Sequence, residues 1–340
     1  MIMNKVSVVI LNWNGEEMLR RFLPSVIEHS IGEGVEVCVA DNGSTDASVQ
    51  MLRATFPSVR LIELDSNYGF AEGYNRALDQ VEAEYVVLLN SDVEVTPHWL
   101  DPLVDFMDNH PEVAACQPKL LNQRNKSCFE YAGAAGGYLD KYGYPFCRGR
   151  IFEVVEEDKG QYETIETVFW VSGAAMFIRL KDYQDVGGLD KDFFAHMEEI
   201  DLCWRLKSRG KELMYVPQSK VYHVGGATLN KGNPRKTFLN FRNNLLMLYK
   251  NLPDSELNSV LRVRKCLDIL AALVFFLKGE RGNARAVFQA RNEFKKMVGL
   301  YESVREENMR QTVVKSIGQR TSYSILWKFH VCGKKIFTQL

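Results

Sequence analysis

The chain has 340 residues, of which 46% are hydrophobic and 25% charged, a composition typical of a soluble globular protein with a large core. Its formal net charge of −1 gives no reason to expect nucleic acid as a partner. The charge is uneven, because residues 251–340 hold 16 Lys and Arg against 8 Asp and Glu, whereas residues 1–250 hold 26 against 35. This asymmetry predicts a basic C-terminal extension with a role of its own.

The first third of the chain alternates short apolar runs with segments of helical spacing. The apolar runs predict strands at residues 6–11, 35–40, 59–64, 86–89 and 113–117. The spacing of apolar residues between them predicts helices at 17–28, 71–81 and 99–109, and Thr45 or Asp46 can cap a further helix. The alternation and the short connections predict an α/β fold with a doubly wound, mainly parallel sheet flanked by helices.

The rest of the chain is less regular. Residues 119–168 predict an irregular excursion, partly a lid or an acceptor loop, and residues 169–178 are apolar again. A helix is expected to begin near Glu198, and short strands at Val216 and at 221–224, around Pro217. Beyond about Asn233 the pattern predicts helices to the end of the chain, at 234–250, 255–278 and 283–298.

Polar residues follow four of the predicted strands directly. They lie at 12–14, 41–46, 67–69 and 90–92. Because the carboxyl ends of parallel strands meet at one edge of the sheet, these four loops converge there. A single loop of this kind is an ordinary turn, but four at one edge predict a nucleotide site.

Seven segments in this order resemble the family 2 glycosyltransferases. They are VSVVILNWNG (6–15), VADNGSTD (39–46), NYGFAEGYNRAL (67–78), YVVLLNSDVEV (85–95), WVSGAAMFIR (170–179), GGLDKDFFAHMEEIDLCWRLKSRG (187–210) and VYHVGGAT (221–228). Within that family the chain is most similar to the bacterial rhamnosyltransferase-like enzymes of cell-surface polysaccharide synthesis. The resemblance implies a GT-A (Rossmann-like) catalytic domain over residues 1–250, followed by a helical extension over 251–340.

The resemblance also implies which residues bind the nucleotide of the donor. Trp13 matches a position that stacks near the nucleobase, and its alternative is a core aromatic at the end of a strand. Asp41 matches a carboxylate that accepts a hydrogen bond from the N–H of a pyrimidine. The other donor-binding positions are Asn12, Asn14, Asn67, Gly69, Asn90, Ser91, Asp92, Ser172 and Gly173.

Asp92 matches the second acid of the DxD motif of the family, which holds a divalent metal ion, Mn²⁺ or Mg²⁺. The first acid is replaced here by Asn90, so that direct ligation by this residue is left open. His223 matches a position that reaches the metal or the diphosphate, and its alternative is an ordinary structural histidine. Arg242 and Asn243 resemble a pair near the diphosphate, and their alternative is a solvated helix face.

Three acidic residues open the helix expected near residue 198. Acidic side chains stabilise the first turn of a helix, which could explain one or two of them. By resemblance, Glu199 is the catalytic base that takes the proton of the acceptor hydroxyl, and Glu198 is the second choice. A neighbouring carboxylate such as Glu198 would raise the pKa of the base. Asp201 is expected to hold local structure, against Arg205.

The C-terminal extension combines apolar and basic side chains between residues 262 and 278. This segment forms either an amphipathic helix on a membrane surface or a helix packed on the catalytic domain or on a second copy of the chain. The longest apolar run, 269–277, is too short to span a bilayer, and the chain start lacks a cleavable signal. Seven cysteines without a CxxC pair suggest a reducing compartment, so the expected location is cytoplasmic, with peripheral contact to the inner face of the plasma membrane.

The residues alone predict a nucleotide-type edge that bears Asp41 and Asp92, with an acidic cluster at 198–201, and the resemblance implies that the chain is an inverting, metal-dependent glycosyltransferase. Its donor would be a nucleoside-diphosphate sugar of the dTDP-rhamnose or UDP-hexose type, and its acceptor a glycan or a lipid-linked glycan. Two alternatives are a sugar nucleotidyltransferase and a catalytically weakened sugar-nucleotide-binding protein. The segment after the first strand lacks the basic, glycine-rich loop that a nucleotidyltransferase needs for a triphosphate.

Overall fold

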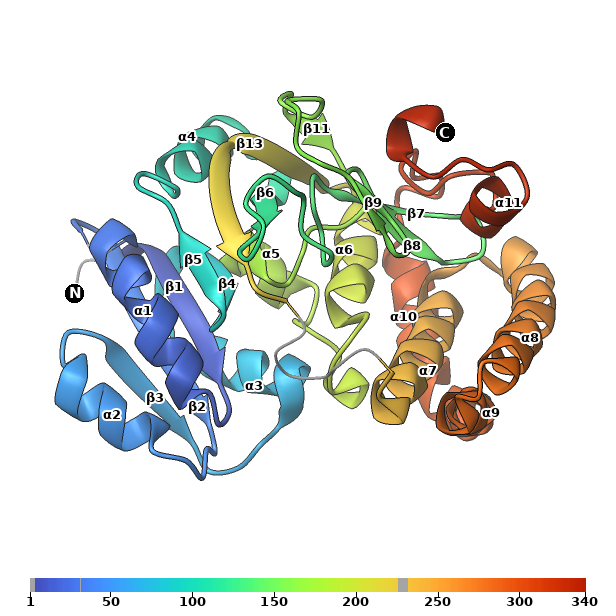
Figure 1. Ribbon diagram of the computed structural model, residues 1–340, viewed down its shortest axis with the longest axis horizontal. Helices are drawn as coiled ribbons and strands as arrows, with labels where there is room; N and C mark the ends of the chain where they lie inside the picture. The colour runs from blue at the N-terminus through green and yellow to red at the C-terminus, as the bar shows by residue number, and fades with distance from the viewer. Residues whose placement is uncertain (1–3, 31, 226–231) are drawn as a thin grey trace.

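The computed structural model describes residues 4–30, 32–225 and 232–340. Its centre is a mixed, mainly parallel sheet in the order β11-β13-β6-β12-β4-β1-β2-β3, with β5 on β13 (Figure 1). The parallel part comprises β1 (Asn4–Asn12), β2 (Val35–Asn42), β3 (Arg60–Leu64) and β4 (Ala83–Asn90). The predicted α/β architecture of this part of the chain is confirmed.

Helices cover both faces of this sheet. Val6, Val8 and Ile10 of β1 pack on one side with α1 (Glu16–Ser30), whereas Val9 packs on the other side. The remaining flanking helices are α2 (Ser48–Thr55), α3 (Gly69–Leu78), α4 (Asp101–Asn109), α5 (Leu180–Asp185) and α6 (Glu198–Ser208). Because alternate residues of a strand point to opposite faces, burial of both faces requires the continuous apolar runs of the sequence.

The second half of the sheet is antiparallel in part. β12 (Ala175–Arg179) lies antiparallel between β4 and β6 (Val113–Asn122), and β11 (Glu166–Thr167) pairs with β13. The prediction of separate short strands around Pro217 is wrong, because β13 is one strand, Glu212–His223. Its register against β6 shifts between Val216 and Lys220, so that a bulge accommodates the proline.

The excursion at 119–168 is more ordered than predicted. It contains a second, four-stranded sheet formed by β7 (Gly137–Leu139), β8 (Pro145–Cys147), β9 (Arg150–Ile151) and β10 (Val154–Val155). The end of the chain packs on this sheet, where Phe146 and Ile151 form a cluster with Ile325 and Phe329.

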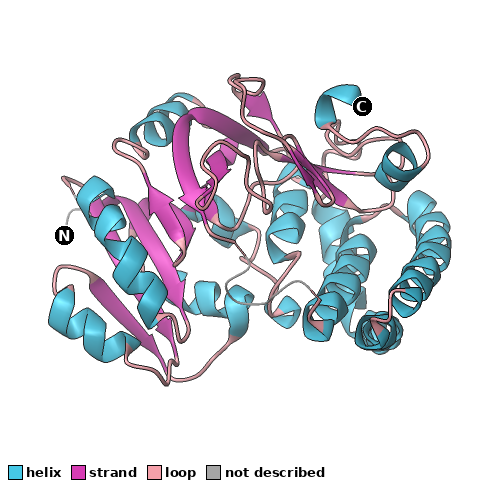
Figure 2. Cartoon of the chain, in the orientation of Figure 1, coloured by secondary structure: helices cyan, strands magenta, loops and turns pink. Residues whose placement is uncertain are grey.

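The C-terminal part is helical as far as Gln311. It comprises α7 (Pro234–Asn251), α8 (Asp254–Leu277), α9 (Arg281–Met297), the 3₁₀ turn η2 (Val298–Tyr301) and α10 (Glu302–Gln311), which lie together at one end of the molecule (Figure 2). The prediction of helices to the chain end is wrong beyond that point. Residues 312–324 are irregular and pair locally with β7, and only α11 (Ile325–His330) and the short η3 (Phe337–Gln339) follow.

None of the helices in the described parts of the chain is long and apolar enough to cross a membrane. The division of the chain at residues 250 and 251 falls at the end of α7 and stays a prediction.

Candidate active site at the carboxyl edge of the sheet

The loop after β1 is tied to the loop after β2 by buried hydrogen bonds. Asn12 is fully buried, and its amide donates to Asp41 Oδ1 (3.0 Å) and to Ser44 Oγ (3.2 Å). The second oxygen of Asp41 accepts from the backbone N–H of Ser44 at 2.9 Å. These bonds hold the Asp41 carboxylate in one orientation at the end of β2, with lone pairs left for a further donor.

Asn14 and Asp46 shape the same two loops. Asn14 has a left-handed backbone (φ 51°), and its side-chain oxygen accepts from the N–H of Thr45 at 2.7 Å. The N-cap position of α2 is Ala47 and not Thr45 or Asp46 as predicted, but Asp46 accepts from the N–H groups of Ser48 and Glu16 at the starts of two helices. Trp13 between them is 49% exposed, so its alternative role as a core aromatic is wrong.

The loop after β3 joins this edge to the segment before α6. Asn67 Oδ1 accepts from the N–H of Gly69 at 2.9 Å, and Gly69 has φ +77°. A Cβ at Gly69 would lie 2.5 Å from the ring of Phe194, so glycine is required for both reasons. The carbonyl of Phe194 accepts from Phe70 N at 2.6 Å and thus caps the start of α3.

Asp92 and His223 form a buried pair at the end of β4. The strand β5 (Val93–Val95) pairs with β13, which places His223 opposite Val93 and therefore beside Asp92. Asp92 Oδ1 lies 3.0 Å from His223 Nε2, and Oδ2 accepts from Gly225 N at 3.2 Å. Burial opposes ionisation of Asp92, but the charge and hydrogen bond of His223 lower its pKa.

Glu130 is a partner of His223 that the sequence analysis missed. It is buried at the start of the excursion, and its Oε1 lies 3.3 Å from His223 Nδ1. Burial alone would lower the pKa of His223, but the carboxylates of Glu130 and Asp92 raise it to about 10. No motif surrounds Glu130, and its separation of 93 positions from His223 gives no periodic signal.

Asn90 lies at the same place, with its side-chain nitrogen 3.3 Å from His223 Nε2. A protonated His223 cannot accept a hydrogen bond, so rotation of the Asn90 amide would present its oxygen to the ring instead. Ser91 follows in the turn between β4 and β5, partly buried.

The acidic start of α6 is held in an unusual backbone. Phe194, His196 and Met197 all have positive φ, between 64° and 73°, a conformation that costs free energy and is concentrated at functional sites. Glu198 is buried and Glu199 half-buried, and each has an Oε2 without a hydrogen-bond partner among the described residues. Burial raises the pKa of Glu199 to about 7, and burial with the neighbouring Glu199 charge raises that of Glu198 further.

Arg242 and Asn243 of α7 hold this strained segment in place through hydrogen bonds to its carbonyl groups. Asn243 is fully buried, and its amide donates to the carbonyls of Phe193 (2.8 Å), Ala195 (3.0 Å) and His196 (2.8 Å). Arg242 donates to the carbonyl of Asp192 at 2.7 Å. The alternative of a solvated helix face is therefore wrong for Asn243, which supports the backbone that carries Glu198 and Glu199.

Asp201 has a structural role, as predicted. It is fully buried and accepts from Arg205 Nε (3.0 Å), Lys250 Nζ (2.8 Å) and Asn251 Nδ2 (2.8 Å). Burial alone would raise its pKa, but the charges of Lys250 and Arg205 lower it. The third acid of the cluster is thus neutralised within the fold, whereas within residues 4–30, 32–225 and 232–340 no ion pair to Glu198 or Glu199 is found.

Residues 172–174 connect the Asp92 side of the site to the Glu199 side. The hydroxyl of Ser172 donates to the carbonyl of Ala132, so it serves local structure. A Cβ on Gly173 would lie 3.7 Å from Cβ of Glu199 and 3.4 Å from the ring of Phe70. The carbonyl of Ala174 accepts from Asn90 N at 3.0 Å. The sequence-predicted residues of both sides therefore lie at one edge of the sheet.

The donor atoms at Asp92 fit a divalent metal ion, provided that the metal displaces the proton that His223 Nε2 carries in the unliganded pair. Neighbouring ligands at 2.0–2.1 Å from an octahedral ion are about 3 Å apart, and Asp92 Oδ1 and His223 Nε2 lie at 3.0 Å. Glu130 on the far nitrogen matches the carboxylate that orients a metal-binding histidine. Within the described residues no group of three or more His, Cys, Asp or Glu side chains is arranged to hold a metal, so this pair would share it with substrate oxygens or water.

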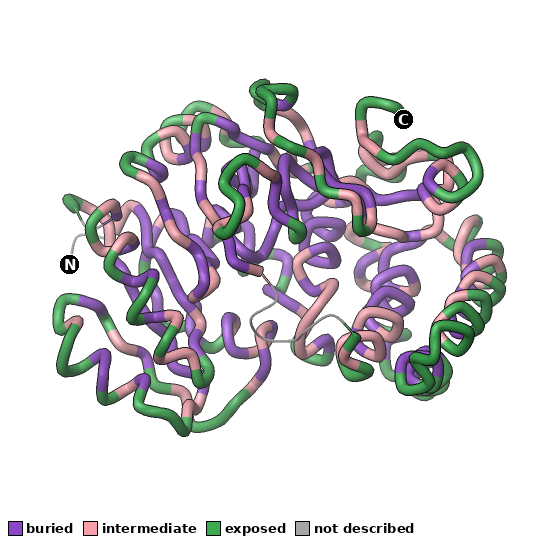
Figure 3. Tube along the Cα trace, in the orientation of Figure 1, coloured by how far each residue is buried: buried purple, intermediate pink, exposed green. Residues whose placement is uncertain are grey.

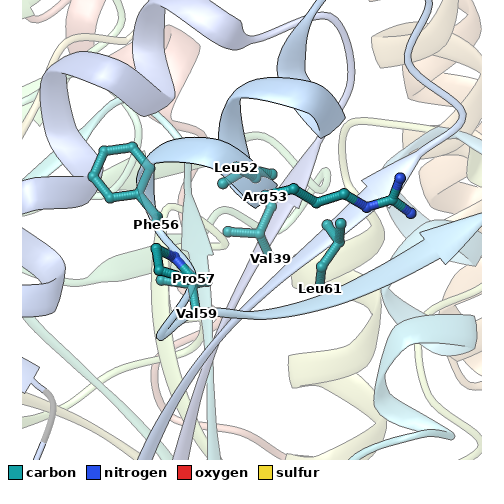
Figure 4. A pocket seen from close by; sticks show the side chains of 7 residues that line it. All are labelled: Val39, Leu52, Arg53, Phe56, Pro57, Val59 and Leu61. Carbon is teal, nitrogen blue, oxygen red and sulfur yellow. The ribbon is translucent and has the colours of Figure 1, made fainter.

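A separate pocket lies under the end of α2. Its lining comes from the middle of β2 and β3 and from α2, at Val39, Leu52, Arg53, Phe56, Pro57, Val59 and Leu61 (Figure 4). Its one charged side chain, Arg53, pairs with Glu63 at 2.5 Å. The pocket includes none of the polar loop residues and is not the donor site.

Comparison with known proteins relates the chain to one family of glycosyltransferases. The sequence model described as Glycosyl transferase family 2 matches residues 7–157, and that of Glycosyl transferase family group 2 matches residues 85–236. An N-acetylglucosaminyl-diphospho-decaprenol L-rhamnosyltransferase of Mycobacterium tuberculosis is 29% identical over 64% of this chain and 75% of its own length. The rhamnosyltransferase WbbL of Escherichia coli is 24% identical over 64% of this chain and 83% of its own.

Solved structures share the fold at lower identity. TarS of S. aureus (residues 1–349) superposes with a TM-score of 0.56 at 14% identity, over 90% of this chain and 88% of that one. GalNAc-T7, solved with UDP, GalNAc and Mn²⁺, superposes with a TM-score of 0.54 at 18% identity, over 68% of this chain and 45% of that one. The predicted GT-A fold is confirmed by these likenesses.

Proposed function

Since residues 7–236 make this chain a member of glycosyltransferase family 2, we propose that it transfers a sugar with inversion from a nucleoside-diphosphate sugar to a glycan acceptor. The proposal rests on one observation: Asp92 and Glu199 lie at the same edge of the sheet, linked through residues 172–174. The Asp92 carboxylate is neutralised by a histidine and a backbone N–H, whereas the Oε2 atom of Glu199 has no hydrogen-bond partner in the part of the chain that the structure describes. Membership of the family disfavours both a nucleotidyltransferase and a non-catalytic binding protein.

Glu199 is the proposed base. Its half-buried carboxylate has a pKa of about 7, close to the pH at which a base is most effective. It takes the proton from the acceptor hydroxyl while that oxygen bonds to the anomeric carbon. The bond from that carbon to the diphosphate breaks on the opposite face, and the nucleoside diphosphate leaves with the electron pair. Burial is what raises the pKa of Glu199, and the Glu199 charge in turn adds to the burial that raises the pKa of the neighbouring Glu198.

The loops at 12–14, 41–46 and 67–69 would bind the nucleotide. Trp13 offers an exposed ring for stacking on the base, and the fixed Asp41 carboxylate would accept from the N–H of a pyrimidine. Asn12, Asn14, Asn67 and Gly69 position these loops through hydrogen bonds among themselves. The rhamnosyltransferases among the relatives favour dTDP-rhamnose as the donor over a UDP-hexose.

Asp92 and His223 would hold Mn²⁺ or Mg²⁺, with Asn90 and Ser91 beside it. The bound metal would neutralise the charge that develops on the departing diphosphate. GalNAc-T7, which shares this fold, was solved with Mn²⁺ and UDP.

The acceptor is proposed to be a lipid-linked glycan, reached from the cytoplasmic face of a membrane. This follows from the name of the mycobacterial relative, whose substrate is a sugar on decaprenyl diphosphate. The half-buried position of Glu199 is consistent with a hydroxyl that approaches from outside the donor site.

A donor panel tests the proposal. The purified chain is incubated with Mn²⁺ or Mg²⁺, an N-acetylglucosaminyl-diphospho-polyprenol, and either dTDP-rhamnose or a UDP-hexose, and released nucleoside diphosphate is measured. We expect release from dTDP-rhamnose that depends on the acceptor, with the anomeric configuration of the product inverted. No release with any donor, or a product of retained configuration, would contradict it.

The variant Glu199→Gln should lose about 10²- to 10⁴-fold in turnover while donor binding persists, because only proton removal is lost. Glu302→Gln, in the first turn of α10 and exposed, is the matched control and should turn over normally. Full activity of Glu199→Gln would assign the base elsewhere.

A further inference from the structure

The solvent-facing side of α8 carries a stripe of large apolar side chains. Leu277 is 74% exposed, and none of the others is less than 42% exposed. The stripe consists of Ile269, Leu270, Leu273, Val274, Phe276 and Leu277. These positions recur at the spacing of one helix face, and Figure 3 shows α8 exposed along the outer end of the molecule.

The opposite side of α8, which packs on the protein, is more polar than the stripe. Its buried residues are Val260, Arg264, Asp268 and Ala272. Asp268 pairs there with Arg264 at 3.3 Å and also contacts Arg291 of α9. A helix that merely covers a core places its apolar side inward. In α8 the apolar side faces outward instead, which indicates that the stripe contacts a molecule outside this chain.

Cationic side chains flank the stripe at both ends. Five of them are exposed: Arg262, Lys265, Lys278, Arg281 and Arg285. Across residues 258–292, the exposed carboxylate is Glu280, and it accepts a hydrogen bond from Asn283. Much of the positive excess of residues 251–340 is therefore gathered around the apolar stripe.

We propose that this face of α8, the apolar stripe with its five flanking cations, binds the surface of an anionic lipid bilayer. Apolar side chains would enter the boundary of headgroups and acyl chains, while Lys and Arg would contact lipid phosphates. A second copy of the chain fits less well. Because both ends of the stripe are basic, parallel and antiparallel pairing would each place like charges together.

This contact is independent of the transfer reaction, although it agrees with the proposed lipid-linked acceptor. Helices α8 and α9 lie at one end of the molecule, and α6 and α7 lie between them and the parallel strands (Figure 1). The bilayer would thus meet a surface distinct from the donor loops.

Vesicle flotation tests the proposal without any substrate. The full chain is mixed with phosphatidylcholine vesicles that contain 0% or 30% phosphatidylglycerol, at low and high salt. We expect binding to the anionic vesicles that weakens with salt. The variant with Leu270, Leu273 and Leu277 replaced by Ser should bind about a hundredfold more weakly, because the removed side chains would each be buried in the interface.

The matched control replaces Val155, Ile165 and Val313, which are exposed elsewhere, by Ser and should bind like the wild type. Melting curves check that both triple variants are folded. The proposal is overturned if the wild type does not float with anionic vesicles or if the α8 variant floats equally well. A concentration-dependent dimer that the α8 variant abolishes, without vesicle binding, would instead assign this face to a second copy of the chain.

Discussion

Removal of the Asn243 amide should allow the backbone before Glu198 and Glu199 to move, so that these two carboxylates leave their positions relative to the donor loops. In Asn243→Ala, the carbonyls of Ala195 and His196 lose the donor at 3.0 Å and 2.8 Å, whereas that of Phe193 keeps the N–H of Ala195. A buried acceptor left without a partner costs about 1–3 kcal/mol. Ala195 and His196 are only partly buried, so the cost for each carbonyl lies in the lower part of this range, and the two together destabilise the segment by about 2–3 kcal/mol.

That free energy acts on a backbone already strained by three residues of positive φ. Since 1.4 kcal/mol changes a population tenfold, a cost of about 2–3 kcal/mol disfavours the productive conformation about 30- to 150-fold, and we expect kcat to fall by about that factor. The KM for the donor should change little, because the donor loops at 12–14 and 41–46 do not contact Asn243. The acidic limb of the pH profile should move below pH 7 as water reaches Glu199.

Steady-state kinetics over a range of donor concentration and pH measure these quantities. Asn240→Ala is the matched control, because Asn240 lies one turn earlier on α7 and its amide donates to the carbonyl of Lys236 of its own helix, with no other partner among the described residues. An unchanged kcat and pH profile in Asn243→Ala would show that the hydrogen bonds of Asn243 do not position Glu199. An equal loss in Asn240→Ala would attribute the effect to α7 as a whole.

Two further outcomes follow from the titrating groups. Because burial raises the pKa of Glu199 to about 7, the base is protonated below that pH, so kcat/KM should fall about tenfold per unit below pH 7 and level off above it; a flat profile from pH 5.5 to 8 would contradict the assignment. In Glu130→Gln, the amide oxygen can still accept from Ala132 N, but the charge that orients His223 is lost. Affinity for Mn²⁺, measured by thermal shift, should fall about 10- to 100-fold. An unchanged affinity would show that His223 does not bind the metal.

Several features follow from the sequence because their causes are local. The strands at 6–11 and 86–89 could be predicted because a strand buried on both faces needs an unbroken apolar run. The convergence of the loops after β1 to β4 follows from parallel pairing alone. Asp201 pairs with Arg205 one turn away, a contact that helical spacing makes visible.

Other features depend on contacts between distant positions, which no local pattern records. Asn243 donates to carbonyls about fifty residues earlier in the chain. Glu130, at the start of the excursion, contacts His223, which follows the excursion in the sequence. The small sheet of 137–155 was missed because its strands of two or three residues are too short to show alternation.

The sequence by itself therefore determined the α/β core and the likeness to family 2 glycosyltransferases, and it led to the prediction of Asp92 and Glu199 as the two acidic groups of the site. Only the tertiary structure decided which side chains support those groups and which way α8 faces. The periodicity of residues 254–277 shows an apolar stripe in the sequence but contains no information on whether the stripe meets the core or solvent. Packing settled that question, since the paired charges of Arg264 and Asp268 occupy the inner side and leave the leucines outside.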